Sequence, residues 1–185
     1  TYVDQYHFGL RKGYRYLDAA AFTPTITDGA VAGNEETTTN KRNYQYFAFK
    51  GTDNDTAIEA KFRMPDDWDL GTIKVKIDWG IAFGILKDDT VRWQIRGGVI
   101  RDGSVLDFAL GSVVNLDDDI LASGYTKLHQ TGASAAITIG GSPAVGDLVI
   151  LRINRDYDYE EVKVDAKLYG VTIEYGIKAA IPTAW

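Results

Sequence analysis

The sequence predicts an all-β protein, a jelly-roll-like sandwich of two sheets with an extended N-terminal arm. Three observations predict this fold class. First, the 185 residues contain about ten short segments in which apolar and polar side chains alternate, the pattern of half-buried strands. Second, turn-forming residues separate these segments at the spacing that is common in sandwiches and barrels. Third, no segment keeps a helical period for more than about two turns.

The chain divides into an N-terminal arm with a long polar connection over 1–43, a β-sandwich domain over 44–176 and a tail over 177–185. The first twenty residues mix aromatic and basic side chains with glycines, which fits an edge strand and turn, or an arm that packs on a neighbouring subunit. Residues 23–43 are rich in threonine and poor in large apolar groups, so we expect a loop or extended connection there. The residues expected to contact a partner are Tyr2, Tyr6, Phe8, Arg11, Tyr14, Tyr16 and Trp185.

Four regular strands are predicted between residues 44 and 96. They cover 44–49, 57–64, 71–80 and 91–96. Within 71–80 the odd positions from 73 to 79 carry isoleucine, valine and tryptophan, whereas the even positions carry lysine and aspartate. One face of that strand is therefore expected to be buried. Trp68, Trp79 and Trp93 fall on apolar faces, which favours a place in the core over an exposed sugar-stacking role.

The pattern between residues 97 and 147 is less regular. Residues 105–110 predict a helical turn, and 112–116 a short strand that ends at the aspartates 117–119. Two more short strands are expected at 125–130 and 136–139. Residues 147–153 are apolar on both faces, which indicates a buried strand.

The last strand contains a change of register. Its apolar residues occupy even positions from 162 to 168 and odd positions from 171 to 175. The switch falls at Tyr169–Gly170, and a shift of one residue within a strand is what a β-bulge produces. We therefore predict a bulge at Tyr169–Gly170.

Composition excludes several classes of function. A formal net charge of −6 argues against nucleic-acid binding, which favours a basic surface. The chain has no cysteine, so disulfides, thiol catalysis and thiolate metal sites are absent. No apolar run reaches the roughly 18 residues of a membrane helix, and the N-terminus lacks the pattern of a signal peptide. We expect neither nucleic acid nor membrane as a partner.

No catalytic, cofactor or metal residues are assigned from the sequence. His7 and His129 have no triad pattern around them, and the glycine-rich segment 140–146 lacks the ending of a phosphate loop. Acidic residues are frequent, and 117–119 and the pair Asp156 and Asp158 are the best candidates for calcium, although turns and solubility also favour aspartate. A glycosidase needs two carboxylates, which the 26 acidic residues neither support nor exclude.

Four stretches, residues 16–24, 62–72, 134–148 and 165–171, resemble a group of virion proteins of tailed bacteriophages. The similarity spans residues 14 to 175, whereas the first dozen residues and the tail do not match. The resemblance implies a capsid decoration or head-fibre-like jelly-roll protein of the virion, not an enzyme. It also implies a homo-oligomer, most often a trimer, that binds the major capsid protein or another virion protein.

The leading hypothesis is therefore a virion decoration protein that associates with its own copies and with the capsid surface. The alternative is a tail-fibre or receptor-binding domain, a β-sandwich that binds carbohydrate. A hydrolase is the third hypothesis, and it requires a pair of carboxylates in a cleft.

Overall fold

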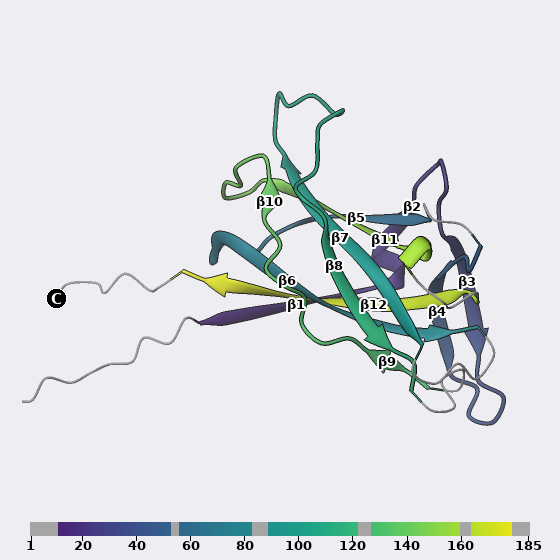
Figure 1. The fold of residues 1–185 in the computed structure, drawn as a ribbon. Coiled ribbons are helices and arrows are strands. Elements are labelled where there is room, and N and C mark those ends of the chain that lie inside the picture. The colour runs from purple at the N-terminus through teal and green to yellow at the C-terminus, as the bar shows by residue number, and fades with distance from the viewer. Residues whose placement is uncertain (1–10, 53–55, 83–88, 122–126, 160–163, 179–185) are drawn as a thin grey trace, which may run out of the picture.

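The structure is a computed structural model that describes residues 11–52, 56–82, 89–121, 127–159 and 164–178 (Figure 1). These residues form two packed β-sheets and two short 3₁₀ turns, η1 (Ala19–Ala21) and η3 (Tyr157–Tyr159), and contain no α-helix. The predicted fold class, an all-β sandwich of two sheets, is confirmed. No helix in these residues has the length and apolar character needed to span a membrane.

The first sheet has the order β3-β4-β12-β6-β9, with β1 paired to β12. β4 pairs with the start of β12 and β1 with the rest of it, so that these two strands follow one another along the same edge of β12. The strands of this sheet are β1 (Lys12–Asp18), β3 (Val31–Glu36), β4 (Asn43–Phe49), β6 (Trp68–Ile81), β9 (His129–Gln130) and β12 (Ala166–Ile177).

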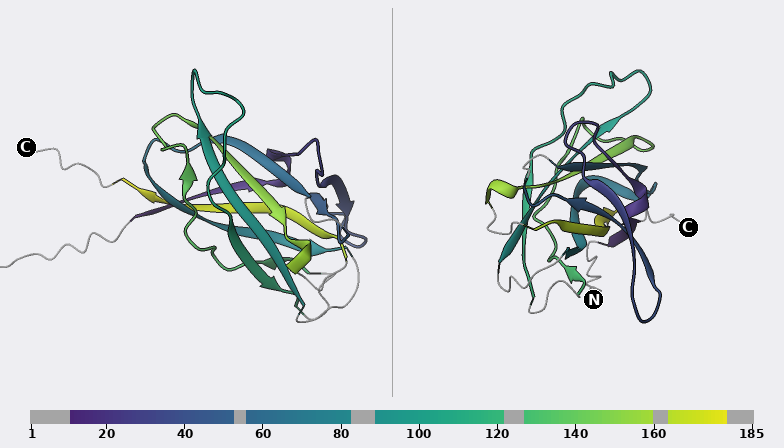
Figure 2. Two further views of the ribbon diagram at one scale, coloured as in Figure 1. Left: turned by 45° about the horizontal axis from the view of Figure 1, so that its top comes forward. Right: turned by 90° about the vertical axis from the view of Figure 1, so that its right-hand side faces the viewer.

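The second sheet has the order β10-β7-β11-β5-β2, with β8 paired to β7. The strand predicted to be buried at 147–153 corresponds to β11. It is the central strand of this sheet, because it lies between β7 and β5. The strands of this sheet are β2 (Phe22–Pro24), β5 (Ala57–Arg63), β7 (Thr90–Ile100), β8 (Val114–Asp119), β10 (Ile139–Gly140) and β11 (Leu148–Arg155). The β3–β4 hairpin and the segment between β7 and β8 project from opposite sides of the body (Figure 2).

Tryptophans fill the space between the sheets, as the alternation predicts. Trp79 and Trp93 are completely buried and meet edge to face, with ring centroids 6.1 Å apart. Trp68 is buried as well. The indole Nε1 of Trp79 donates a hydrogen bond of 2.7 Å to Asp118, which satisfies a polar atom that burial would otherwise leave unpaired.

The predicted bulge in β12 is confirmed. Leu168 pairs with Trp79 and Gly170 with Asp78, which are adjacent residues of β6, so that Tyr169 is the extra residue. Because a bulge places two residues opposite one, side-chain alternation restarts at Gly170. Both Tyr169 and Gly170 consequently occupy outward positions of β12. The side chain of Tyr169, and any Cβ added at Gly170, lie on the side of the first sheet that is turned away from the core.

Two predicted irregular segments are strands instead. Residues 31–36 form β3, which pairs with β4 along its whole length, although 23–43 were expected to be a connection. The apolar content of β3 is low because a strand at the edge of a sheet is held by backbone hydrogen bonds and needs no buried side chains of its own. Residues 117–119, expected at a turn, lie within β8 and pair with Thr90, Val91 and Arg92 of β7.

The predicted helical turn at 105–110 is wrong, since the structure has only irregular chain and bends there. At the N-terminus, residues 12–18 form an edge strand, β1, as one of the two predictions for this region has it. Whether residues further upstream pack on a neighbouring subunit stays a prediction. Four expected contact residues lie outside the described residues, namely Tyr2, Tyr6, Phe8 and Trp185.

Candidate functional site

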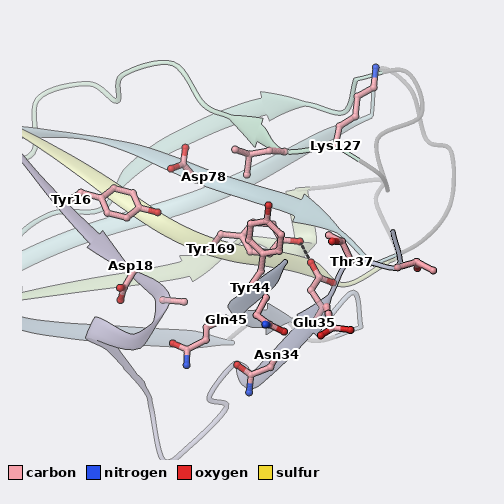
Figure 3. Close-up of a pocket in the computed structure, with 15 residues that line it drawn as sticks. Tyr16, Asp18, Asn34, Glu35, Thr37, Tyr44, Gln45, Asp78, Lys127 and Tyr169 are labelled. Atoms are coloured by element: carbon pink, nitrogen blue, oxygen red, sulfur yellow. Dashed lines mark hydrogen bonds between the residues drawn. The ribbon is translucent and has the colours of Figure 1, made fainter. Parts of the chain in front are cut away.

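A cleft of about 1090 Å³ opens on the outer face of the first sheet (Figure 3). Its lining comes from β1, η1, β3, β4, β6 and β12, together with residues 37–38 and 127–128. Pockets that hold small ligands typically measure roughly 300–1,000 Å³. The cleft is therefore large enough for an extended molecule such as a short polymer.

The tyrosines of the cleft are placed by strand alternation. Tyr16 of β1 and Tyr44 of β4 occupy outward positions and stay 55% and 43% exposed. Tyr169 of β12 also faces outward, one position after the buried Leu168. Large, half-exposed aromatic rings on a strand face are costly to leave in water, and their grouping in a cleft indicates a surface built for a ligand.

We call Tyr44, Tyr46 and Tyr169 the tyrosine cluster: Tyr44 and Tyr169 form one wall of the cleft, and Tyr46 contacts Tyr169 from outside the lining. The rings of Tyr44 and Tyr46 both meet the ring of Tyr169 edge to face, at centroid distances of 5.9 and 6.2 Å. Such contacts fix the orientation of each ring. The cluster is consequently a rigid surface rather than a set of independent side chains.

Glu35 of β3 connects the tyrosine cluster to that strand through hydrogen bonds. The hydroxyl of Tyr169 donates a hydrogen bond of 2.6 Å to Oε1 of Glu35, and the ammonium of Lys167 donates to Oε2. Both contacts reach from β3 to β12 across the intervening β4, so the sheet must curl around its outer face. Lys167 Nζ also lies 4.7 Å from the ring centroid of Tyr46.

The environment of Glu35 keeps it ionised. Partial burial acts to raise its pKa, but the hydrogen bonds from Lys167 and Tyr169 and the charge of Lys167 outweigh burial and lower the pKa below its ordinary value. Burial, followed by the bond to the Glu35 carboxylate, raises the pKa of Tyr169. The Tyr169 hydroxyl therefore stays protonated and continues to donate to Glu35.

Tyr16 rests against a glycine. A Cβ atom added to Gly170 would stand 2.1 Å from the Tyr16 hydroxyl and 2.5 Å from Cζ, so the hydroxyl end of the ring occupies the space that any other residue would fill. Burial raises the pKa of Tyr16, and the charges of Asp78 and Asp18 add to this effect. Figure 3 shows these two carboxylates on either side of the ring.

Several polar groups of the cleft keep capacity for a ligand. Within the described residues, no hydrogen bond engages the side chains of Asp18, Asn34 and Gln45 or the Tyr16 hydroxyl. Asp78 accepts one bond of 2.8 Å, from Gln130 to its Oδ1. Carboxylate acceptors and a hydroxyl beside the Tyr16 ring suit a ligand that has both apolar faces and hydroxyl groups.

Three residues expected to contact a partner, Arg11, Tyr14 and Tyr16, belong to the described part of the chain, and of these three Tyr16 lines the cleft. Tyr14 is 62% exposed on the same strand but lies outside the cleft lining. Arg11 is also exposed, and its carbonyl accepts a backbone bond from Ile177. The positions of these residues do not test whether they contact a partner, so their role in partner contact stays a prediction.

Sequence reasoning missed most of the cleft. The alternation places Tyr44 in a regular strand and Tyr169 at a bulge, but it does not show that the two side chains meet. A usable signal existed, since tyrosine repeats at outward positions of β1 and β4. Glu35 and Lys167 gave no signal, because their meeting depends on the curl of the sheet.

Four of the five aspartates considered for calcium accept hydrogen bonds from protein side chains. Asp117 forms a two-pronged pair with Arg92, at 2.7 Å for each bond. Asp119 accepts a bond from Thr90, and Asp156 accepts one from Gln94. The part of the chain that the structure describes contains no group of three acidic or histidine residues arranged to hold a metal ion.

His129 is buried and stacks on Trp79 with ring centroids 4.6 Å apart. His7 lies outside the described residues. His129 does not line the cleft.

Comparison with known proteins finds similarity only at the level of fold. No protein-family model matches the sequence. No curated protein matches it either. Among solved structures, the CBM22-1 and GH10 modules of xylanase 10B from Clostridium thermocellum, solved with xylohexaose, match at a TM-score of 0.49 and 13% identity. The match covers 91% of this chain and 28% of that one.

Two further matches are complete modules. The mannan-recognising module TmCBM27 matches at a TM-score of 0.47 and 9% identity, over 89% of this chain and 98% of its own. The xylan-binding module CBM15 matches at 0.45 and 11%, over 91% and 100%. At these identities and scores the matches carry no argument about function. The resemblance to phage virion proteins is likewise untested by them and stays a prediction.

Proposed function

We propose that this chain is a non-catalytic carbohydrate-binding β-sandwich domain that holds a glycan in the cleft of the first sheet. The observation that carries the proposal is the surroundings of Tyr16, a half-exposed ring beside Asp18, which no hydrogen bond from the described residues engages, and Asp78, which accepts one from Gln130. A sugar ring has apolar C–H faces and a rim of hydroxyls. Its face can stack on an aromatic ring while carboxylates and amides accept from or donate to its hydroxyls.

Rigidity supports the same function. The tyrosine cluster is fixed by ring contacts, and Glu35 joins it to β3 through Tyr169 and Lys167. A wall that is already ordered loses little conformational entropy when a ligand binds. Such a surface can bind a flexible glycan even though each individual sugar contact is weak.

Glu35 is a poor candidate for the general acid of a hydrolase. Glycosidases need a carboxylic acid whose pKa is raised so that it can protonate the leaving group. Glu35 has a pKa lowered by its partners, and both of its oxygens already accept hydrogen bonds. Its contacts suit a structural tie and not a general acid.

The test is a calorimetric titration of the full chain with a panel of soluble oligosaccharides of different linkage and composition. We expect at least one to bind with a one-to-one stoichiometry. Tyr16→Ala should weaken that binding, whereas Tyr14→Ala, on the same strand and face but outside the cleft, should not. A panel without binding, or equal losses for both variants, would refute the proposal.

The place of such a domain in a virion is predicted by the resemblance alone. A receptor-binding domain of a tail fibre would agree with both the resemblance and a glycan-binding cleft. Capsid decoration would agree with the resemblance, but the cleft does not support it. Deleting residues 1–15 tests the decoration hypothesis, which predicts loss of attachment to particles. The trimer and the capsid partner are predictions that await measurement of the assembly.

A further inference from the structure

Two aspartates face each other across β12 at the position of the bulge. Gly170 pairs with Asp18 of β1 on one side and with Asp78 of β6 on the other. Neighbouring strands are roughly 4.8 Å apart, so the two aspartate Cα atoms are separated by about 10 Å. The residue between them has no side chain, which leaves an open space between two carboxylates.

Tyr16 occupies this space from the side. Its hydroxyl end lies where a Cβ of Gly170 would be, which places the ring between Asp18 and Asp78 (Figure 3). More than half of the Tyr16 side chain remains open to solvent. A sugar stacked on this ring would therefore have a carboxylate at each of two opposite edges.

The cations of this region compensate the two aspartates only in part. Within the described residues, Lys167 is paired with Glu35 and Lys41 with Glu36. Lys127 lines the cleft but lies away from Tyr16 (Figure 3). Lys76 shares the outward face of β6 with Asp78, yet no ion pair joins them.

We propose that Tyr16, Asp18 and Asp78 form a sugar subsite that accepts uncharged sugars and rejects sugars bearing a carboxylate. This inference rests on the proposed function. Both oxygens of Asp18 and Oδ2 of Asp78 can accept hydrogen bonds from hydroxyl groups of a sugar, while Oδ1 of Asp78 already accepts from Gln130. A uronate held against Tyr16 would bring a third negative charge close to the first two, and like charges at such short range repel each other.

The experiment compares the tightest-binding uncharged oligosaccharide of the panel with the same compound oxidised to uronate at its primary hydroxyls. If the best ligand has no primary hydroxyl, an uncharged hexose oligosaccharide that also binds replaces it. We expect the oxidised form to bind at least tenfold more weakly at low salt. The penalty should shrink as sodium chloride is raised, because salt screens charge repulsion.

The double variant Asp18→Asn, Asp78→Asn tests the residues themselves. This variant should lower the ratio of the affinity for the uncharged oligosaccharide to the affinity for its oxidised form severalfold. The ratio should fall even if the affinity for the uncharged oligosaccharide also changes. Asp102→Asn, a substitution of an exposed aspartate between β7 and β8, should leave the ratio unchanged. Circular dichroism spectra would verify that all variants fold.

Equal or tighter binding of the oxidised form would overturn the inference and leave the proposed function standing. A penalty that is insensitive to salt and to the double variant would also overturn it, because a steric clash would then explain the rejection. Absence of binding by every oligosaccharide would instead refute the proposed function.

Discussion

Replacing Tyr16 with alanine should weaken glycan binding about tenfold. The ring keeps 55% of its accessible surface, which for an aromatic side chain of roughly 200 Å² is about 110 Å². A sugar that covers half of this surface removes about 55 Å² from water. At about 25 cal/mol per Å² this burial contributes about 1.4 kcal/mol, or tenfold in affinity.

The assay is the calorimetric titration of wild type, Tyr16→Ala and Tyr14→Ala with the same oligosaccharide, at one pH and salt concentration. Tyr14→Ala removes a ring of similar exposure from the same strand, and we expect it to change the dissociation constant by less than about twofold. Urea unfolding should show that Tyr16→Ala keeps its fold, because its ring is largely at the surface. A dissociation constant for Tyr16→Ala within twofold of the wild-type value would refute the reasoning.

Three further predictions concern two residues of the site, Gly170 and Glu35, and one residue of the core, Trp79. Gly170→Ala places a Cβ 2.1 Å from the Tyr16 hydroxyl, so it should weaken binding severalfold in wild type but hardly at all in a Tyr16→Ala background; equal effects in both would contradict this. Glu35 has a folded-state pKa below its ordinary 4.5, so its stabilising effect is complete above that pH and is lost as the pH falls through the folded-state value. The urea midpoints of wild type and Glu35→Gln should therefore differ more at pH 7 than at pH 3, and a pH-independent difference would argue against the Lys167 pairing. Trp79→Ala should lower the free energy of unfolding by about 3–5 kcal/mol, since the ring is fully buried; a loss below about 1 kcal/mol would mean that the core is packed differently.

The main strands and the bulge could be predicted because they depend on local alternation. Residues 71–80 bury one face whichever strand pairs with them, and the change of phase at Tyr169–Gly170 is visible in the sequence itself. β3 could not be predicted, because its place at the edge of the sheet is fixed by backbone pairing with β4. Its side chains carry no apolar period to reveal it.

The cleft depends on contacts that no local pattern encodes. Tyr16, Tyr44 and Tyr169 are distant in the sequence and come together only when β1 and β4 follow one another along β12. Glu35 reaches Tyr169 only because the sheet curls. The outward positions of the tyrosines were readable from alternation, whereas their convergence required the tertiary structure.

The most direct test of the central claim is a two-dimensional ¹H–¹⁵N NMR titration with the tightest-binding oligosaccharide. Glycan binding in the cleft predicts that the largest amide shifts fall on β1, β4 and the bulge of β12, around Tyr16, Tyr44 and Tyr169. The outer face of the second sheet should stay unchanged. Shifts confined to the second sheet, or none at saturating ligand, would contradict the assignment of the cleft as the binding site.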